Sequence, residues 1–268
     1  MKFSVITPAL NCAQYIRRNI ESVRRQAHAF GELEHWIIDG GSTDETIMLL
    51  KSEKDTRWRS EPDDGLADAV NKGIRLASGE WIIWLNADDE LAPGALEDLN
   101  KAVNLWPDVS IFVGAEKIFS YDGTLECVAE AWNYNLSQLL GSRTAINQAA
   151  TFVHRRVYER VGLLNTTFRY AMDYEWIVRA VHEFRCQPLN GVLAHYHRRR
   201  GSIMDAGIAG QHREFLRVRR MYGKSRWELS ELKFRFYLAS DWLRRIPVLR
   251  SMVRTLKRNF PTLFGIAR

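Results

Sequence analysis

The first 90 residues alternate short apolar runs with segments in which apolar side chains recur every three or four positions. Short apolar runs predict strands, and the longer spacing predicts helices. The predicted strands are KFSVITP, HWIID, RWRSE and WIIWL. The predicted helices span residues 13–26, 44–54 and 66–77. This alternation is typical of βαβ units, and apolar residues throughout the strands favour a sheet covered by helices on both faces.

After residue 90 the pattern is looser. Pro93 and Gly94 precede a predicted helix over 95–103. Further predicted strands are SIFVGA, ATFVHR and GVLAHYH, and further predicted helices span 133–140 and 174–184. Past Gly210 the chain is helical in pattern, and residues 247–260 place apolar side chains on one face and Lys and Arg on another. That last segment is a basic amphipathic helix.

The composition is that of an ordinary soluble protein, with 268 residues, 46% hydrophobic and 26% charged. Because no apolar run reaches the roughly 18 residues of a spanning helix, and MKFSVITPAL lacks the features of a signal peptide, we expect a cytoplasmic protein. Cys12, Cys127 and Cys186 are odd in number and widely spaced. We expect reduced, mostly packing cysteines rather than disulfides or a zinc site.

The net charge of +6 is unevenly divided along the chain. Residues 198–268 hold 18 Lys and Arg against 5 Asp and Glu, whereas residues 1–197 hold 20 against 27. A basic segment after an acidic body suggests a docking surface for a membrane, a nucleic acid or another anionic polymer. We expect a main domain over 1–205 and a basic helical tail over 206–268.

Polar clusters follow three of the predicted strands, at residues 7–11, 39–44 and 86–90. In an open α/β sheet the carboxyl ends of the strands form the ligand-binding edge, so we expect these clusters to meet. Neither GxGxxG nor GxxxxGK[ST] occurs in the chain, so the edge is not a phosphate-cradling loop of those types. Asp88 and Asp89 are adjacent, and like charges in a confined site repel unless a cation compensates.

Oxygen ligands of this kind favour Mg²⁺ or Mn²⁺, usually with substrate phosphates and water completing the metal shell. The sequence therefore predicts a metal site for Asp88 and Asp89 and a substrate that carries phosphate. The alternative is that both carboxylates lie on a solvated loop or cap a helix.

Five stretches, in this order, carry a family resemblance: SVITPALN, IIDGGSTDET, SEPDDGLADAVNKGIRLASGEWIIWLNADDE, NQAATFVHRRVYERVG and AMDYEWIVRA. They span about residues 3–180 and resemble family 2 glycosyltransferases of the GT-A type, which are inverting enzymes that use nucleotide-diphosphate sugars. The form DDGLADAVNKG is most similar to members that build bacterial surface polysaccharides. The resemblance implies an α/β, Rossmann-like GT-A fold with a mixed central sheet, and here a C-terminal helical extension.

Carried over by position, the resemblance implies a nucleotide pocket lined by Thr7, Pro8 and Asn11, with Asp39 meeting the base, usually uracil. It places Asp63 and Asp64 against the nucleotide or sugar. Asn71 and Lys72 lie on the helix that follows.

For the metal, the resemblance implies that Asp88 and Asp89 take the place of the family's DxD-type motif, with Asp89 the stronger candidate for direct ligation of Mn²⁺ or Mg²⁺. Asn86 stands where a carboxylate is common, which affects how the ribose or the outer metal shell is held. Many relatives bring a histidine to the metal just before a Gly-Ser pair. Here three arginines, Arg198 to Arg200, stand between His197 and the Gly201-Ser202 pair, so His197 is a candidate ligand that does not match the family spacing. The arginines could instead neutralise the diphosphate of the donor.

Asp173 matches the family's catalytic base, with the cap of a helix as the alternative. Glu175 would face away from the site on a helix. Gln148 falls where the family often contacts the acceptor or donor sugar, and a buried hydrogen-bonding Gln is the alternative. Trp81 and Trp84 fit the core better than a sugar platform.

The resemblance thus implies a metal-dependent inverting transfer from a nucleotide-diphosphate sugar, chiefly UDP-linked, to a glycan or polyprenyl-linked saccharide. The basic helix over 247–260 would lie on the anionic inner leaflet or pack on the catalytic domain. One alternative is a sugar nucleotidyltransferase, although no glycine- and arginine-rich triphosphate loop is present near the N-terminus. The other is a nucleic-acid-binding protein, which lacks a recognition motif here, so we expect no nucleic-acid partner.

Overall fold

The computed structural model describes residues 1–27, 32–141, 146–203 and 208–223. The predicted basic helix over 247–260, and most of the predicted tail over 206–268, lie outside these residues.

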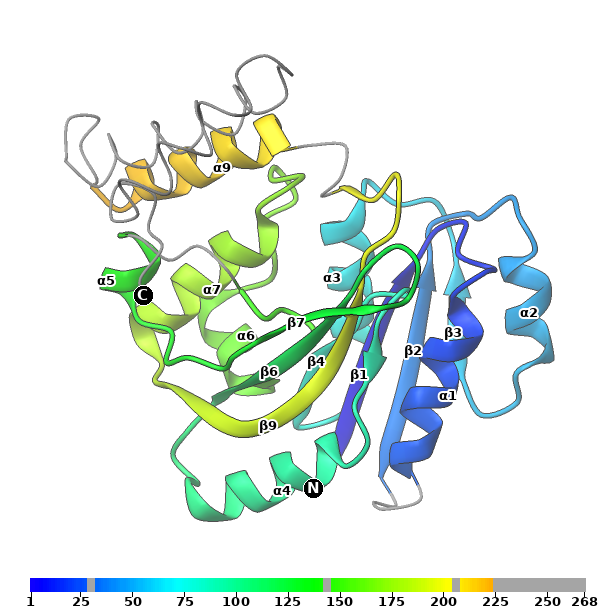
Figure 1. The fold of residues 1–268 in the computed structure, drawn as a ribbon, viewed down its shortest axis with the longest axis horizontal. Coiled ribbons are helices and arrows are strands. Elements are labelled where there is room, and N and C mark those ends of the chain that lie inside the picture. Colours follow the sequence, from blue (N-terminus) through cyan, green and yellow to red (C-terminus); the bar gives the residue numbers. More distant parts are fainter. Residues whose placement is uncertain (28–31, 142–145, 204–207, 224–268) are drawn as a thin grey trace.

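Half of the central sheet is parallel (Figure 1). Its strands are β1 (Phe3–Ala9), β2 (Leu33–Asp39), β3 (Arg57–Ser60) and β4 (Trp81–Trp84). They are joined by α1 (Ile16–Ala27), α2 (Thr46–Ser52) and α3 (Leu66–Leu76). Every residue of β1 and β4 is buried, as expected for strands covered on both faces. The predicted βαβ pattern of the first 90 residues is confirmed.

The other half mixes strand directions. Its strands are β5 (Glu90–Leu91), β6 (Ile111–Phe119), β7 (Leu125–Ala129), β8 (Thr151–His154) and β9 (Cys186–His197). β8 lies antiparallel between β4 and β6, whereas β9 runs parallel to β6. The described residues form a nine-stranded sheet of order β3-β2-β1-β4-β8-β6-β9-β5, with β7 paired to β6. The expected α/β fold with a mixed central sheet is confirmed.

The remaining helices of the described chain are α4 (Ala95–Leu105), α5 (Leu136–Leu139), α6 (Arg155–Val161), α7 (Met172–Glu183) and α9 (Ile208–Met221). Alternate strand residues point to opposite faces of the sheet, and the core follows this rule. Ile82 belongs to a cluster that includes side chains of α3, α6 and α7, whereas Ile83 belongs to one that includes α4. The sheet is therefore buried between helices on both sides.

Several elements differ from the sequence expectations. β5, β7 and α6 were not predicted, because β5 has two residues, β7 is almost wholly exposed, and α6 follows β8 without a break. Cys12 and Cys186 are buried as expected, but Cys127 is exposed. Cys127 is the exception to the expected packing role, because β7, which among the described strands pairs with β6, presents this residue to solvent.

The helix α9 falls in the predicted tail but shares the core of the main domain. Phe215 and Val218 belong to the same buried cluster as Ile177 and Val178 of α7. Figure 1 shows α9 lying beside the amino-terminal end of α7. A division at residue 205 stays a prediction. None of the described helices is both long and apolar enough to cross a membrane.

Asn71 joins α3 to a distant loop. Its side-chain amide donates to the Leu164 carbonyl and its side-chain oxygen accepts from the Leu164 N–H, both at 2.9 Å. Asn71 is 3% exposed and Leu164 is 4% exposed. Both backbone groups of Leu164 are therefore satisfied by one buried amide.

Replacing Asn71 with Ala should lower the free energy of unfolding by about 2–3 kcal/mol, because two buried backbone groups lose their partner. Urea denaturation of the two proteins measures this change. Asn104→Ala, at an exposed position of α4, is the matched control. A loss for Asn71→Ala no larger than that of the control would contradict the assignment.

Candidate active site

The carboxyl end of β1 is tied to the end of β4 by hydrogen bonds. The Thr7 hydroxyl lies 3.3 Å from Asn19 Oδ1 and 2.9 Å from His35 Nε2. Asn19 in turn donates to the backbone oxygens of Asn86 and Asp89. Burial lowers the pKa of His35 to about 3, so the imidazole is neutral. Thr7 and Pro8 are both buried, and a contact of either with the nucleotide stays a prediction.

The loop after β1 is joined to the loop after β2 through Asn11. Asn11 has a φ of 49°, a conformation that asparagine tolerates better than most residues. Its side-chain oxygen accepts from the N–H groups of Thr43 and Asp44, and its N–H donates to Ser42 Oγ. Two of the three predicted polar clusters therefore meet, as expected.

Asp39 is fully buried at the end of β2 and holds the following turn. One carboxylate oxygen accepts from the N–H groups of Gly41 and Ser42 and from the Ser60 hydroxyl. The other accepts from the Ser42 hydroxyl. In this arrangement Asp39 shapes the turn, and its contact with a base stays a prediction.

Asp63 packs on the same turn. A Cβ atom at Gly40 would overlap the Asp63 carboxylate, so glycine permits the approach. Asp63 accepts from Gly65 N–H at 2.9 Å, while the neighbouring Asp64 is exposed. Asp63 thus reaches the loop edge beside Asp39.

Lys72 and Asn71 face other parts of the protein. Lys72 Nζ lies 3.1 Å from Asp68 and 3.4 Å from Glu61, and donates to the Pro62 carbonyl. Asn71 is buried against Leu164. In the structure Lys72 is bonded to the segment between β3 and α3 and to α3 itself, Asn71 is bonded to the Leu164 backbone, and a direct contact of either with a donor stays a prediction.

The third cluster follows β4, where each carboxylate has a different environment. Asp89 is 1% exposed and accepts from Asn86 Nδ2 at 3.2 Å and from the His197 N–H at 3.1 Å. Asp88 is more accessible, and its Oδ2 lies 2.6 Å from Arg199 Nε. The Arg199 Nε has no hydrogen bond of acceptable geometry, so this contact is a close ion pair.

Glu90 is neutralised by three basic side chains. Its carboxylate lies 2.9 Å from His197 Nε2, 3.1 Å from Arg18 Nε and 3.5 Å from Arg25 Nη2. Burial alone would raise the pKa of Glu90, but the His197 hydrogen bond and the Arg18 charge outweigh it and lower the pKa. The His197 ring is thus directed to Glu90 and stacks on Phe119, and only its backbone contacts Asp89. Metal ligation by this ring stays a prediction.

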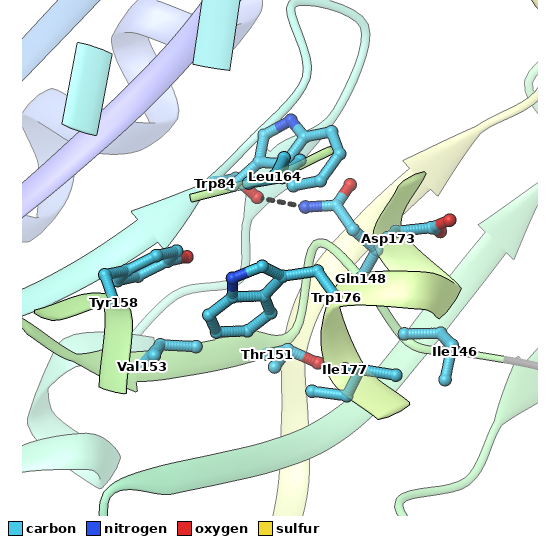
Figure 2. A pocket seen from close by; sticks show the side chains of 10 residues that line it. All are labelled: Trp84, Ile146, Gln148, Thr151, Val153, Tyr158, Leu164, Asp173, Trp176 and Ile177. Atoms are coloured by element: carbon cyan, nitrogen blue, oxygen red, sulfur yellow. Dashed lines mark hydrogen bonds between the residues drawn. The ribbon is translucent and has the colours of Figure 1, made fainter. Parts of the chain in front are cut away.

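Asp173 lines a pocket next to the end of β4 (Figure 2). Burial raises the pKa of Asp173 to about 6, and hydrogen bonds from backbone N–H groups, including that of Tyr174, partly offset this rise. The other lining residues are Trp84, Ile146, Gln148, Thr151, Val153, Tyr158, Leu164, Trp176 and Ile177. The carboxyl is therefore held in a mostly apolar hollow.

Gln148 connects this pocket to the cluster after β4. Its amide donates to the Trp84 carbonyl at 2.6 Å, and its oxygen accepts from Asn86 Nδ2 at 3.1 Å. The Trp84 indole N–H donates to Asn86 Oδ1. Trp84 is buried as expected, but it also forms part of the pocket wall.

Sequence reasoning missed several residues at this site. Glu116 is a buried carboxyl on β6 that accepts from Ala150 N–H at 3.1 Å, and burial raises its pKa to about 7. The pattern of polar and apolar residues along β6 does not distinguish Glu116 from a solvent-facing glutamate. Asn19, on the buried face of α1, carries an equally weak signal. Glu175 is buried and paired with Arg179, so it stabilises α7.

The acidic cluster fits part of a metal shell. Among the described residues no group of three or more His, Cys, Asp or Glu side chains could hold a metal ion. However, burial and the neighbouring Asp88 charge raise the pKa of Asp89, and a divalent cation would relieve this conflict. Two carboxylates suit Mg²⁺ or Mn²⁺ when substrate phosphates and water complete the shell.

Comparisons with known proteins identify the family. Residues 4–161 match the family model for glycosyl transferase family 2. An uncharacterized glycosyltransferase of Mycobacterium tuberculosis is 31% identical over 218 residues, which cover 79% of this chain and 78% of that protein. A PGL/p-HBAD biosynthesis glycosyltransferase of Mycobacterium bovis is 29% identical over 188 residues, which cover 66% and 68% of the two chains.

Solved structures match the fold. The complex of S. aureus TarS 1-349 with UDP-GlcNAc has a TM-score of 0.61 at 15% identity, covering 99% of this chain and 90% of that chain. In a longer TarS chain the match covers 54% of that protein. The mannosyltransferase PcManGT from Pyrobaculum calidifontis, in complex with GDP-Man and Mn²⁺, has a TM-score of 0.63 at 17% identity, covering 88% and 69%. The expected GT-A-type fold is confirmed, and the chain belongs to glycosyl transferase family 2.

Proposed function

We propose that this glycosyltransferase is a metal-dependent, inverting enzyme that moves one sugar from a nucleotide-diphosphate donor to a saccharide acceptor. The observation that carries the proposal is the position of Asp173. Its half-buried carboxyl lines a pocket that Gln148 and Asn86 connect to Asp89 of the Asp88-Asp89 pair. A base in the pocket, linked through hydrogen bonds to a carboxylate pair that could hold a cation, is what such a transfer needs.

Asp173 serves as the general base. The acceptor hydroxyl attacks the anomeric carbon, the bond from that carbon to the diphosphate oxygen breaks, and the hydroxyl proton passes to the Asp173 carboxylate. The apolar surroundings that raise its pKa also raise its strength as a base. Such assistance typically contributes about 10²- to 10⁴-fold in rate.

The donor occupies the edge formed by the loops after β1, β2 and β4. Asn11, Asp39 and Asp63 form the nucleotide side, with Thr7 and Pro8 beneath. TarS was solved with UDP-GlcNAc and PcManGT with GDP-Man, which supports a nucleotide-sugar donor for this chain. Among donors we favour a UDP-sugar.

Asp88 and Asp89 would hold Mn²⁺ or Mg²⁺, which when bound supplies positive charge to the leaving diphosphate. The Mn²⁺ in the PcManGT complex supports this assignment. Arg199 lies beside the proposed metal site. Its guanidinium contacts Asp88 and lies 5.9 Å over the Tyr15 ring. We propose that Arg199 neutralises Asp88 when no metal is bound and turns to the donor diphosphate when one is.

The acceptor is a glycan or a lipid-linked saccharide of bacterial surface polysaccharide assembly. The PGL/p-HBAD biosynthesis relative supports an acceptor from cell-surface material. Binding to the inner face of the cytoplasmic membrane through the basic helix over 247–260 stays a prediction, since that helix lies outside the described residues.

Release of nucleotide diphosphate from a panel of UDP-, GDP- and dTDP-sugars, each with Mn²⁺, Mg²⁺ or EDTA, tests the function. We expect slow hydrolysis of one UDP-sugar by the wild type, dependent on metal. Asp173→Asn and Asp89→Ala should each lose about 10²-fold or more. Release of inorganic pyrophosphate from a sugar phosphate and a nucleoside triphosphate would instead indicate a nucleotidyltransferase.

The dependence of kcat on pH should follow the ionisation of Asp173. The base must be ionised to accept a proton, and its pKa is raised to about 6. We therefore expect kcat to rise with pH up to about 6 and to level above it. The control variant Asp108→Asn, at an exposed position, should show the same rise of kcat with pH as the wild type. A profile that is flat between pH 4.5 and about 7.5 would contradict the assignment.

Replacing Arg199 with Gln should change the affinities for Mn²⁺ and for UDP in opposite directions. Mn²⁺ should bind about three- to tenfold more tightly, because Asp88 loses a competing cation, and UDP in the presence of saturating Mn²⁺ should bind more weakly by a similar factor, because the diphosphate loses the guanidinium. Mn²⁺ electron paramagnetic resonance and calorimetry measure these affinities. Arg198→Gln removes an arginine paired with Glu126 and serves as the control. Equal effects of the two substitutions would exclude a specific role of Arg199.

A further inference from the structure

The residues that lead into α7 are held by one carboxylate from another helix. The N–H groups of Arg169, Tyr170 and Ala171 donate to Glu214 of α9 at 2.9, 2.7 and 2.8 Å. Ala171 is the N-cap residue of α7 and makes no side-chain cap hydrogen bond. Glu214 therefore holds the backbone immediately before this helix, and Asp173 lies two residues after the last of these donors.

Glu214 is itself fixed by the packing of α9. The Phe215 ring meets the Tyr174 ring edge to face at 4.7 Å. The Arg217 guanidinium lies 4.4 Å over Phe168, and Arg219 donates to the Gly141 carbonyl at 2.6 Å. The position of the Glu214 carboxylate is thus set by contacts along the helix rather than by one flexible side chain.

A close backbone approach completes the arrangement. A Cβ atom at Gly210, in the first turn of α9, would overlap the Tyr170 ring. Tyr170 is one of the residues whose N–H donates to Glu214. Glycine at this position therefore allows α9 to lie against the segment that its glutamate binds.

We propose that Glu214 is a positioning residue for Asp173: by binding the three N–H groups before α7, it fixes where the base enters the acceptor pocket. The inference rests on the proposed function, in which Asp173 is the base. It makes α9 a part of the catalytic apparatus rather than the start of an accessory tail.

The charge of Glu214 also acts on the base. Burial is the main cause of the raised pKa of Asp173, and the negative charge of Glu214 acts in the same direction. The other titratable groups facing or lining the same pocket are the Glu116 carboxyl of β6 and the Tyr158 phenol of α6. Removing the Glu214 charge should therefore lower the pKa of Asp173.

Two substitutions in the full-length chain separate the effect of the length of the Glu214 side chain from the effect of its charge. Glu214→Gln keeps the shape but loses the charge, and Glu214→Asp keeps the charge but is one methylene too short to reach all three N–H groups. Glu183→Gln, which removes an exposed carboxylate paired with Arg160 at the other end of α7, is the matched control. Circular dichroism and thermal unfolding establish that each variant is folded.

We expect kcat to fall about tenfold in both Glu214 variants, because the Asp173 carboxylate is displaced from its position. The affinity for UDP should stay unchanged, because the loops after β1, β2 and β4 that are proposed to bind the donor are not affected. The acid limb of kcat should move to lower pH in Glu214→Gln and stay in place in Glu214→Asp. Glu183→Gln should match the wild type in every measurement. A fall in kcat with an unmoved limb in Glu214→Gln, or a parallel loss of UDP affinity, would overturn the proposal.

A carboxyl ¹³C titration of Asp173, assigned with the Asp173→Asn variant, gives a readout that does not need turnover. A lower pKa of Asp173 in Glu214→Gln than in the wild type supports the proposal, and an equal pKa contradicts it. If the wild type turns over no donor while this pKa still moves, the proposed function fails and the contact between Glu214 and the base stands. If the wild type is active and the Glu214 variants match it, only the present inference fails.

Discussion

Three consecutive carboxylates, Asp88, Asp89 and Glu90, stand at the end of a buried strand, and the site depends on how their repulsion is relieved. Glu90 is surrounded by His197, Arg18 and Arg25. Asp88 faces Arg199. Asp89, the most buried, accepts hydrogen bonds from neutral donors alone within the described part of the chain, which leaves its charge uncompensated there. The imbalance concentrates unmet negative charge at one residue, where a cation is most strongly attracted.

The compensating groups come from two elements that are distant in sequence. Arg18 and Arg25 belong to α1, whereas His197 and Arg199 lie at and just beyond the end of β9. β9 pairs with β5, which contains Glu90 itself. The register of that pairing therefore decides which basic side chain meets which carboxylate, and the sheet and the site cannot be altered independently.

The sequence predicted the parallel half of the fold and the meeting of the strand-end clusters, because both follow from apolar runs and from the geometry of βαβ units. It could not predict β5 or β7, whose short length or exposure leaves no hydrophobic pattern. It could not indicate the contact of the Asn71 side chain with the Leu164 backbone, because these residues lie 93 positions apart in the chain. The roles of Glu116 and Glu214 depend on such long-range contacts, so spacing along the chain gave no signal for either.

The contact between α9 and the start of α7 has a consequence for the order in which the enzyme matures on the ribosome. The donor edge is built from residues before position 90, together with strand β9, whereas the carboxylate that fixes the base lies at position 214. Because synthesis proceeds from the N-terminus, the residues of the nucleotide-binding edge are translated before the glutamate that holds the segment leading to the base. On the proposed assignments, a chain that ends before α9 has the residues for donor binding but lacks both the carboxylate that positions the base and two side chains of the buried core.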